Sequence, residues 1–315
     1  PTSRAYFGPV AALAANYGAF EVLAEPAGPI GSPPVLRIDP PVAYLVPANQ
    51  ARTVGTRKSR LSVIRQKRPS AEQVSVKGTL SISASQRRFA RSVADPVQYA
   101  GAVFDMQLQA LGITRGGELR IGAGGCGYEL EVFEGPALAT AVRRFLKWSN
   151  NFIGETLVKG LGAAGLGPPG TWEKGVQVAR SELEELGVDL STTRWVDGSG
   201  LSRENRVSPR TLVDVLGLAR SHYRFGPEFE AGLPIGGADG TLEERAEGAG
   251  AHLRAKTGLL TGVAGLSGYV LNGEGERLRF AILTNGPTQS ALGVMEALDE
   301  FAAVLSRSGK VTARN

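Results

Sequence analysis

The sequence is poor in the side chains that most often build disulfides, metal sites and charge-relay triads. It contains one cysteine, Cys126, and two histidines, His222 and His252, among 315 residues. A single cysteine excludes an internal disulfide and a cysteine-cluster metal site. Neither histidine lies in a Gly-x-Ser-x-Gly or His-Glu-x-x-His context, which argues against a Ser-His-Asp hydrolase and a zinc hydrolase. We therefore expect no metal and no cofactor.

Long apolar runs and an apolar leader are also missing. No run of about eighteen apolar residues occurs, so the sequence predicts no membrane-spanning helix. The opening residues Pro1 to Arg4 lack the charged-then-apolar pattern of a signal peptide, and we expect a chain that is processed or truncated at that end. With 42% hydrophobic and 21% charged residues, the composition is that of an ordinary globular protein with one large domain or two.

Acidic residues are scarce in one region, between Arg52 and Arg91. The net charge is +5 and the pI is near 9.4. Nucleic-acid binding would require aromatic residues among the cations, and Phe89 is nearly alone there, so we predict no nucleic-acid partner. We favour the solvated face of a β-rich domain, with a surface for a polyanionic cell-wall polymer as the second interpretation. The cations of this region include Arg57, Lys58, Arg60, Arg65, Lys67, Arg68, Arg87, Arg88 and Arg91.

Periodicity divides the chain into a mostly-β part and an α+β part. Short alternating segments are expected as strands at 20–23, 35–38, 61–64 and 74–82. Asp95-Pro96 predicts the start of a helix that ends at Gly112. The glycine-rich stretch 116–127 lacks the Gly-Lys-Ser/Thr ending of a phosphate loop and is interpreted as a connection. Helical periodicity follows at 138–146, 152–158, 171–186, 208–221 and 291–305, with strands at 267–271 and 278–284. The expected domains are 1–125 and 126–315.

Three short motifs carry the candidate chemistry. Lys256-Thr257-Gly258 offers an anionic ligand a positive charge, a hydroxyl donor and space for close approach, on an expected edge strand before the apolar run 259–271. Ser149-x-Asn151 combines a hydroxyl with a carboxamide, although a helix cap alone would explain it. Asp197-Gly-Ser-Gly would be explained equally by a tight turn. Each motif is weak by itself, and the order and spacing of all three give them weight.

With these motifs the sequence resembles the class C low-molecular-mass penicillin-binding proteins, D-alanyl-D-alanine carboxypeptidases/endopeptidases of the DacB type. The resemblance covers essentially the whole chain. It implies an α+β fold, in which a penicillin-binding serine-transferase (β-lactamase/transpeptidase-like) domain is joined to an accessory mostly-β domain. Residues 1–125 would be the accessory region, and 126–315 the C-terminal part of the penicillin-binding domain. The segments that carry the resemblance are 92–99, 147–151, 197–209, 239–242 and 256–269.

The resemblance also implies roles for individual residues. Ser149 and Lys256 would be catalytic, with Ser149 relaying a proton to the leaving group, and Asn151 would bind the substrate amide. Lys256 and Thr257 would hold the terminal D-alanine carboxylate beside Gly258, and the backbone N–H of Leu259 would be half of an oxyanion hole. Peptidoglycan stem peptides would be the substrates and β-lactams acylating inhibitors, in the periplasm or another extracytoplasmic part of the cell envelope.

This sequence differs from the family pattern in two respects. The family nucleophile is the serine of a Ser-x-x-Lys motif, with the lysine as its base, and no Ser-x-x-Lys occurs here. Thr156 and Thr171 each precede a lysine by three residues, but both lie in helical contexts after the Ser149 motif, so neither is expected to be the nucleophile. Leu259 replaces the Thr or Ser that usually follows Lys-Thr-Gly, which removes one hydrogen bond to the substrate carboxylate.

Two interpretations of the missing nucleophile remain open. The chain is either a fragment of an enzyme whose N-terminal segment carries the Ser and Lys, or a natural relative that lost them and binds wall peptides or acts as a scaffold. We favour the fragment, because Ser149, Asn151, Lys256 and Thr257 are all intact. A β-lactamase-like hydrolase is disfavoured, since no carboxylate is clearly placed to activate a deacylating water.

Overall fold

The computed structural model describes residues 3–56, 58–122, 128–129, 131–286 and 291–309. The chain separates into two compact units, Pro1–Val132 and Phe133–Asn315. The boundary expected from the sequence, between residues 125 and 126, falls within 123–127, which lies outside the described residues together with Cys126 and Arg57.

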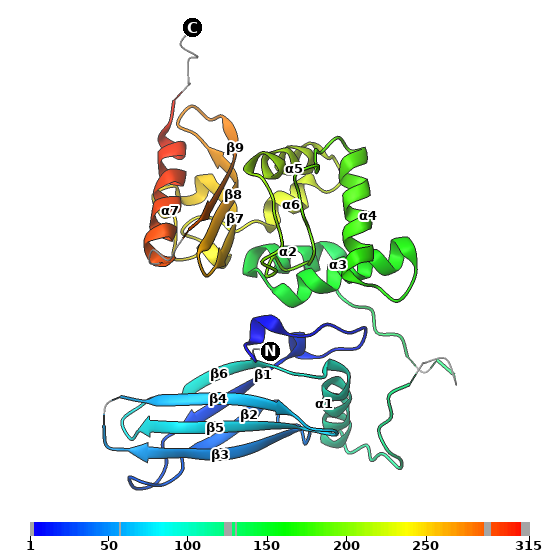
Figure 1. Cartoon of the computed structure of the whole chain (residues 1–315), viewed down its shortest axis with the longest axis vertical. Coiled ribbons are helices and arrows are strands. Elements are labelled where there is room, and N and C mark those ends of the chain that lie inside the picture. The colour runs from blue at the N-terminus through cyan, green and yellow to red at the C-terminus, as the bar shows by residue number, and fades with distance from the viewer. Residues whose placement is uncertain (1–2, 57, 123–127, 130, 287–290, 310–315) are drawn as a thin grey trace. The chain divides into compact units, whose positions relative to one another are not determined.

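The described residues of the first unit form two three-stranded sheets and one α-helix (Figure 1). One sheet has the order β2-β1-β6 and is antiparallel, with β1 (Ala19–Glu25), β2 (Val35–Asp39) and β6 (Arg87–Ser92). The other has the order β3-β5-β4, in which β3 (Leu45–Val54) runs parallel to β5 (Glu72–Ser81) and β4 (Arg60–Lys67) runs antiparallel to it. Helix α1 (Pro96–Ala110) lies at one end of the strands, and short 3-10 turns occupy Ala5–Phe7 and Asn16–Gly18.

Apolar side chains from both sheets form one core in this unit. Phe20 and Val22 of β1 pack with Val74 and Val76 of β5, and Tyr99 of α1 closes the cluster. The predicted helix is confirmed, because Asp95 caps α1 by accepting from the Gln98 N–H at 3.1 Å. Strands β3 and β6 were not predicted.

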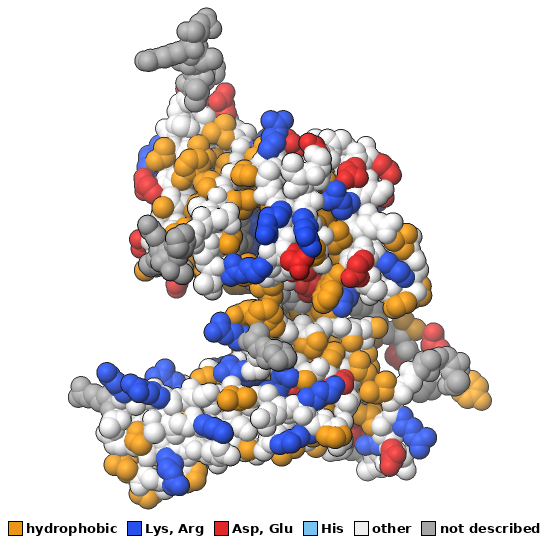
Figure 2. All heavy atoms as spheres, viewed as in Figure 1, with side chains coloured by type: hydrophobic (Ala, Val, Ile, Leu, Met, Phe, Trp, Pro, Cys, Tyr) orange, Lys and Arg blue, Asp and Glu red, His pale blue; other side chains and the backbone are white. Residues whose placement is uncertain are grey.

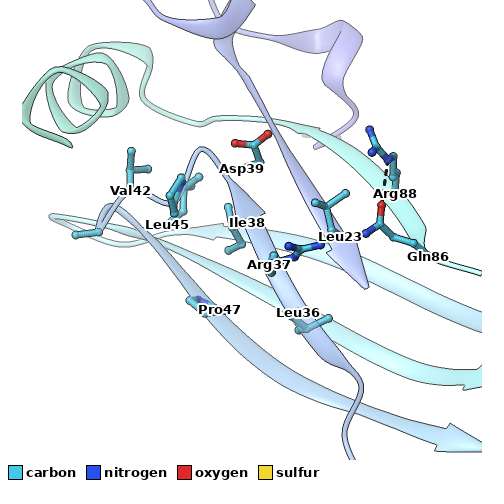
Figure 3. Close-up of a pocket in the computed structure, with 12 residues that line it drawn as sticks. Leu23, Leu36, Arg37, Ile38, Asp39, Val42, Leu45, Pro47, Gln86 and Arg88 are labelled. Atoms are coloured by element: carbon cyan, nitrogen blue, oxygen red, sulfur yellow. Dashed lines mark hydrogen bonds between the residues drawn. The ribbon is translucent and has the colours of Figure 1, made fainter. Parts of the chain in front are cut away.

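A hollow of about 740 Å³ opens beside the edge strand β2 (Figure 3). Leu36 and Ile38 of β2 line it together with Leu45 and Pro47 of β3, and Arg37 and Arg88 also belong to its lining. All of its lining residues fall between 23 and 88, so none of the predicted site residues contributes to it.

The second unit is an antiparallel sheet with helices on both faces (Figure 1). Its strand order is β7-β8-β9, so β7 is an edge strand. Helix α7 packs on one face against β8, and α5 packs on the other against β9. Short 3-10 turns, η3 (Gly240–Leu242) and η4 (Gly250–His252), precede β7. The elements are α2 (Leu138–Trp148), α3 (Asn151–Leu166), α4 (Trp172–Glu185), α5 (Pro209–Ser221), α6 (Gly226–Gly232), β7 (Leu253–Leu260), β8 (Val263–Leu271), β9 (Arg277–Asn285) and α7 (Ala291–Arg307).

Alternation along the strands assigns side chains to the two faces of this sheet. Ala255 and Leu266 pack in the core on the α7 side of the sheet. Tyr269 lies on the other side, where it packs against α2 and α5 and donates its hydroxyl to Leu216 O at 2.7 Å. The apolar run 259–271 is divided by a turn at Thr261-Gly262, so it forms the end of one strand and the whole of the next. Among the described helices, none has the length and apolar character needed to cross a membrane.

Candidate active site

Ser149 occupies a strained position between two helices. It follows the last residue of α2 with φ 51° and ψ 42°, a left-handed conformation that costs a residue with a side chain about 1–3 kcal/mol. The next residue, Asn150, caps α3 by accepting from the Ile153 N–H at 3.2 Å, and Asn151 is the first residue of α3. The chain therefore turns sharply at Ser149, and this turn places its hydroxyl opposite β7.

Lys256 reaches that hydroxyl from β7. Its Nζ donates to Ser149 Oγ at 2.7 Å and to the Thr257 carbonyl oxygen at 2.6 Å. Burial disfavours the charged ammonium and lowers the pKa of Lys256 from 10.5 to about 8. An amine with a pKa this close to neutrality can both give and accept a proton through Ser149.

Thr257 turns to the opposite side of β7 and contacts a second hydroxyl. Its Oγ1 donates to Thr241 Oγ1 at 2.8 Å. Thr241 belongs to η3, just ahead of the strand. The hydroxyls of Ser149, Thr241 and Thr257 and the amino group of Lys256 therefore lie along a short length of β7.

The free edge of β7 exposes backbone groups in the same region. Ala255 N–H donates to Pro234 O at 3.0 Å, and Leu253 O accepts from Gly236 N–H at 3.1 Å. The odd-numbered residues of β7 thus direct their backbone groups away from β8. Thr257 and Leu259 continue this alternation beyond the last of these bonds, so their backbone groups face the open edge.

Gly258 lies between these residues on the exposed end of β7. A Cβ atom added to it would meet no described atom of the chain within 4 Å. The protein's own packing therefore does not require glycine here, and the space beside Gly258 is open to a ligand.

An ion pair between the buried Lys147 and the partly exposed Asp239 links the two sides of the site. Lys147 Nζ lies 2.7 and 2.5 Å from the two carboxylate oxygens of Asp239 and donates to Leu233 O at 2.6 Å. Burial raises the pKa of Asp239, but the hydrogen bonds from Lys147 and the Ile235 N–H outweigh it and hold that pKa below its ordinary value. Lys147 precedes Ser149 by two residues, and Asp239 precedes Thr241 by two. The pair therefore positions both hydroxyls.

The Asp197-Gly-Ser-Gly segment packs against α3, the helix that begins at Asn151. The carboxylate of Asp197 accepts from Gly200 N–H, Ser202 N–H and Asn205 Nδ2 at 2.7–2.9 Å, which makes the segment a closed turn. Gly198 packs against α3 so closely that an added Cβ would lie 2.3 Å from Gly154 O. The described contacts of this segment are those of a turn that holds α3.

The structure brings Ser149 and Lys256 into direct contact and places Thr257, Gly258 and Leu259 along the same strand. Asn151 lies at the start of α3, two residues after Ser149. Lys147, Asp239 and Thr241 were not predicted as site residues. All three lie in segments that carry the family resemblance, 147–151 and 239–242, and that position could have indicated them. Within the described residues, no group of three His, Cys, Asp or Glu side chains could hold a metal ion.

Comparison of the sequence with models of known protein families shows to which family the chain belongs. The model of the D-Ala-D-Ala carboxypeptidase 3 (S13) family matches residues 2–305. The chain belongs to this family. The resemblance to penicillin-binding proteins of the DacB type is thereby confirmed.

The S13 chain is similar to a D-alanyl-D-alanine carboxypeptidase of Actinomadura sp. (strain R39). The two are 34% identical over 293 residues, which are 89% of this chain and 54% of that protein. The S13 chain thus spans about half the length of this relative.

Solved structures confirm the fold class. Penicillin binding protein 4 (dacB) from Haemophilus influenzae matches with a TM-score of 0.78 at 22% identity, over 97% of this S13 chain and 70% of that one. The same protein complexed with a β-lactam also matches with a TM-score of 0.78, at 24% identity, over 98% and 73% of the two chains. The predicted α+β penicillin-binding fold is therefore correct.

Proposed function

We propose that this chain is part of a serine-type D-alanyl-D-alanine carboxypeptidase/endopeptidase that cleaves peptidoglycan stem peptides through an acyl-enzyme. The 2.7 Å hydrogen bond between Lys256 Nζ and Ser149 Oγ, beside the open edge of β7, carries the proposal. Residues 126–315 would supply the C-terminal part of the penicillin-binding domain, and 1–125 the accessory region. The protein would act in the periplasm or elsewhere in the extracytoplasmic envelope.

The substrate would lie along the open edge of β7 as an added strand. Its terminal carboxylate would accept hydrogen bonds from Lys256 and Thr257, whose hydroxyl is already oriented by Thr241. Asn151 would bind the peptide amide, and the space at Gly258 would admit the terminal D-alanine. The backbone N–H of Leu259 would face the scissile carbonyl and stabilise the developing oxyanion.

The reaction would proceed in two acyl transfers. The serine of a Ser-x-x-Lys segment outside the printed sequence would attack the carbonyl carbon between the two D-alanines and give its proton to the lysine of that segment. As the C–N bond breaks, Ser149 would pass a proton to the leaving amine, with Lys256 replenishing it. Water would then hydrolyse the ester. A β-lactam would acylate the same serine.

Mass spectrometry of the protein made from its complete gene tests this proposal. Incubation with penicillin is expected to add one penicilloyl group, and peptide mapping is expected to place it on the serine of a Ser-x-x-Lys segment. Purified peptidoglycan stem peptide should release D-alanine. A protein with an intact Ser-x-x-Lys segment that forms no adduct and releases no D-alanine would contradict the proposal.

A second candidate function is that of an inactive homologue that binds wall peptides or serves as a scaffold. The absence of Ser-x-x-Lys from the printed residues favours it. A complete gene without that motif, together with binding of a D-Ala-D-Ala peptide that is lost in Thr257→Val, would establish this function in place of catalysis.

Leu259→Thr is expected to tighten substrate binding. The side chain of Leu259 is 51% exposed, so a hydroxyl there adds a donor near the carboxylate without disturbing the core. A hydrogen bond to a charged group contributes about 1.5–3 kcal/mol, which corresponds to a fall of about tenfold to a hundredfold in KM or peptide Kd. Leu259→Val, which adds no donor, is the matched control. Equal effects of the two substitutions would contradict the assignment.

A further inference from the structure

The two units of the chain differ in charge. Residues 1–132 contain fifteen Lys and Arg but only nine Asp and Glu. Residues 133–315 contain twenty Lys and Arg and twenty-one Asp and Glu. The positive excess of the protein therefore belongs entirely to the unit that does not contain the candidate active site. Figure 2 shows blue side chains spread among white ones over the strands of this unit.

The strand register of β3, β5 and β4 shows where three of these cations meet. Arg52, Thr79 and Arg60 form one row across the sheet, and Lys77 lies in the next row on the central strand. Val74 and Val76 of the same strand are fully buried, so the alternate positions, which include Lys77, form the outer face. The outer face consists of Val46, Ala48, Gln50, Arg52, Gln73, Ser75, Lys77, Thr79, Arg60, Ser62, Ile64 and Gln66.

No carboxylate occurs at any position of this outer face. Arg52, Lys77 and Arg60 are exposed, and none of them takes part in an ion pair within the described part of the chain. Strands lie about 4.8 Å apart, so the two arginines are separated by roughly 10 Å, with the lysine between them one row away. This spacing is comparable to the Debye length of about 8 Å, and the positive potentials therefore add. Such a face is complementary to a linear chain of negative charges.

The side chains around the cations indicate the chemistry of the partner. The planar fork of Arg52 and Arg60 matches the oxygens of a phosphate group, and Gln50, Ser62 and Thr79 offer further neutral donors in the same rows. The outer face contains no aromatic residue on which a nucleobase could stack. We propose that the outer face of the β3-β5-β4 sheet binds a linear, phosphate-bearing polyanion without bases, of the kind that forms wall polymers.

Binding of fluorescently labelled inorganic polyphosphate to the full chain tests this proposal. The wild-type protein is expected to bind it with an affinity that falls steeply as salt rises. The triple variant Arg52→Gln, Lys77→Gln, Arg60→Gln should bind at least about tenfold more weakly and with a smaller salt dependence. The matched control Arg144→Gln, Arg203→Gln, Arg224→Gln removes three exposed cations of the other unit and should stay within about twofold of the wild type.

Two further probes distinguish the partner class. Single-stranded DNA of equal charge is expected to bind no more tightly than polyphosphate, and polygalacturonate, a carboxylate polymer, more weakly. Equal loss in both triple variants, or no loss in the first, would overturn the proposed surface. Much tighter binding of DNA would assign the face to nucleic acid. None of these measurements depends on acylation, so the result is independent of the proposed enzyme activity.

Discussion

In the protein made from its complete gene, Lys256→Met is expected to lower the rate of penicillin acylation by about 10²–10⁴ while the protein remains at least as stable as the wild type at pH 7. In the proposed mechanism the rate falls because Ser149 loses the amine with which it would exchange a proton, and general acid–base catalysis contributes factors of this size. Stability is retained because a buried ammonium is replaced by an apolar chain of similar length. The two effects together distinguish a catalytic lysine from one that merely holds the fold.

The sign of the stability effect follows from the pKa of Lys256. Burial lowers this pKa to about 8 from 10.5, so between these values the unfolded chain binds a proton that the folded chain does not. Stability therefore rises with pH across this window, and below pH 8 the folded protein bears the full cost of the buried charge. After the loss of two hydrogen bonds is subtracted, Lys256→Met should be more stable by about 1 kcal/mol at pH 7.

Denaturant unfolding between pH 7 and pH 10 checks this expectation. The advantage of the methionine variant should shrink as the pH rises. Lys58→Met removes an exposed lysine of the other unit and should leave the acylation rate unchanged, with stability within about 0.5 kcal/mol of the wild type. If Lys256→Met is acylated at the wild-type rate, or if its acylation is lost only to the extent that the protein unfolds, Lys256 has no part in the mechanism.

Asp239→Ala is expected to destabilise the protein by about 3 kcal/mol. The side chain of Lys147 is only 8% exposed, and without Asp239 its ammonium group keeps, among the described residues, only the Leu233 carbonyl as partner. The Ile235 N–H, which donates to Asp239 at 2.8 Å, also loses its acceptor. Denaturant unfolding at pH 7 measures the loss.

Two comparisons identify the buried charge as the cause. The double variant Asp239→Ala, Lys147→Met should recover part of the stability, because it removes the unpaired ammonium group. Asp214→Ala, which breaks a pair with the 84% exposed Arg210, should cost less than about 0.5 kcal/mol. A double variant no more stable than Asp239→Ala would contradict this explanation.

The pH dependence of Asp239→Ala has a defined direction. The pKa of Asp239 in the folded state lies below its ordinary value of 3.8, so the stability from this carboxylate is present above pH 3.8 and is lost as the pH falls through the folded pKa. The difference between wild type and variant should therefore narrow in acid.

Local signals predicted the described α-helices except α6, and they predicted the strands incompletely. Asp95 was predicted as the start of α1, and Thr171 and Ser208 were the first residues of two predicted helices. Each of the three caps its helix by accepting a backbone N–H. Strand β3 was missed because Pro47 and polar residues interrupt its alternation, a composition that an edge strand tolerates. Strand β6 was missed because arginines occupy half of it and its partner β1 lies far upstream.

The site could be predicted only where a motif or a resemblance pointed to it. Ser149 and Lys256 are separated by 107 residues, and no periodicity connects them. The pairing of Lys147 with Asp239 has no local pattern at all, because a buried lysine looks like a surface lysine in an amphipathic helix. Leu259 was visible as a departure only because the resemblance supplied the residue expected there.

The contact between Thr257 and Thr241 gives the proposed carboxylate subsite a directional property. In the free protein the Thr257 proton points to Thr241. A bound carboxylate is a stronger acceptor, so Thr257 would rotate its proton to the ligand and Thr241 could then donate to the oxygen that was released. Each bond in such a chain polarises the next. The anion would thus meet a pair of dipoles that align together, and a hydroxyl outside direct reach of the ligand would strengthen its binding.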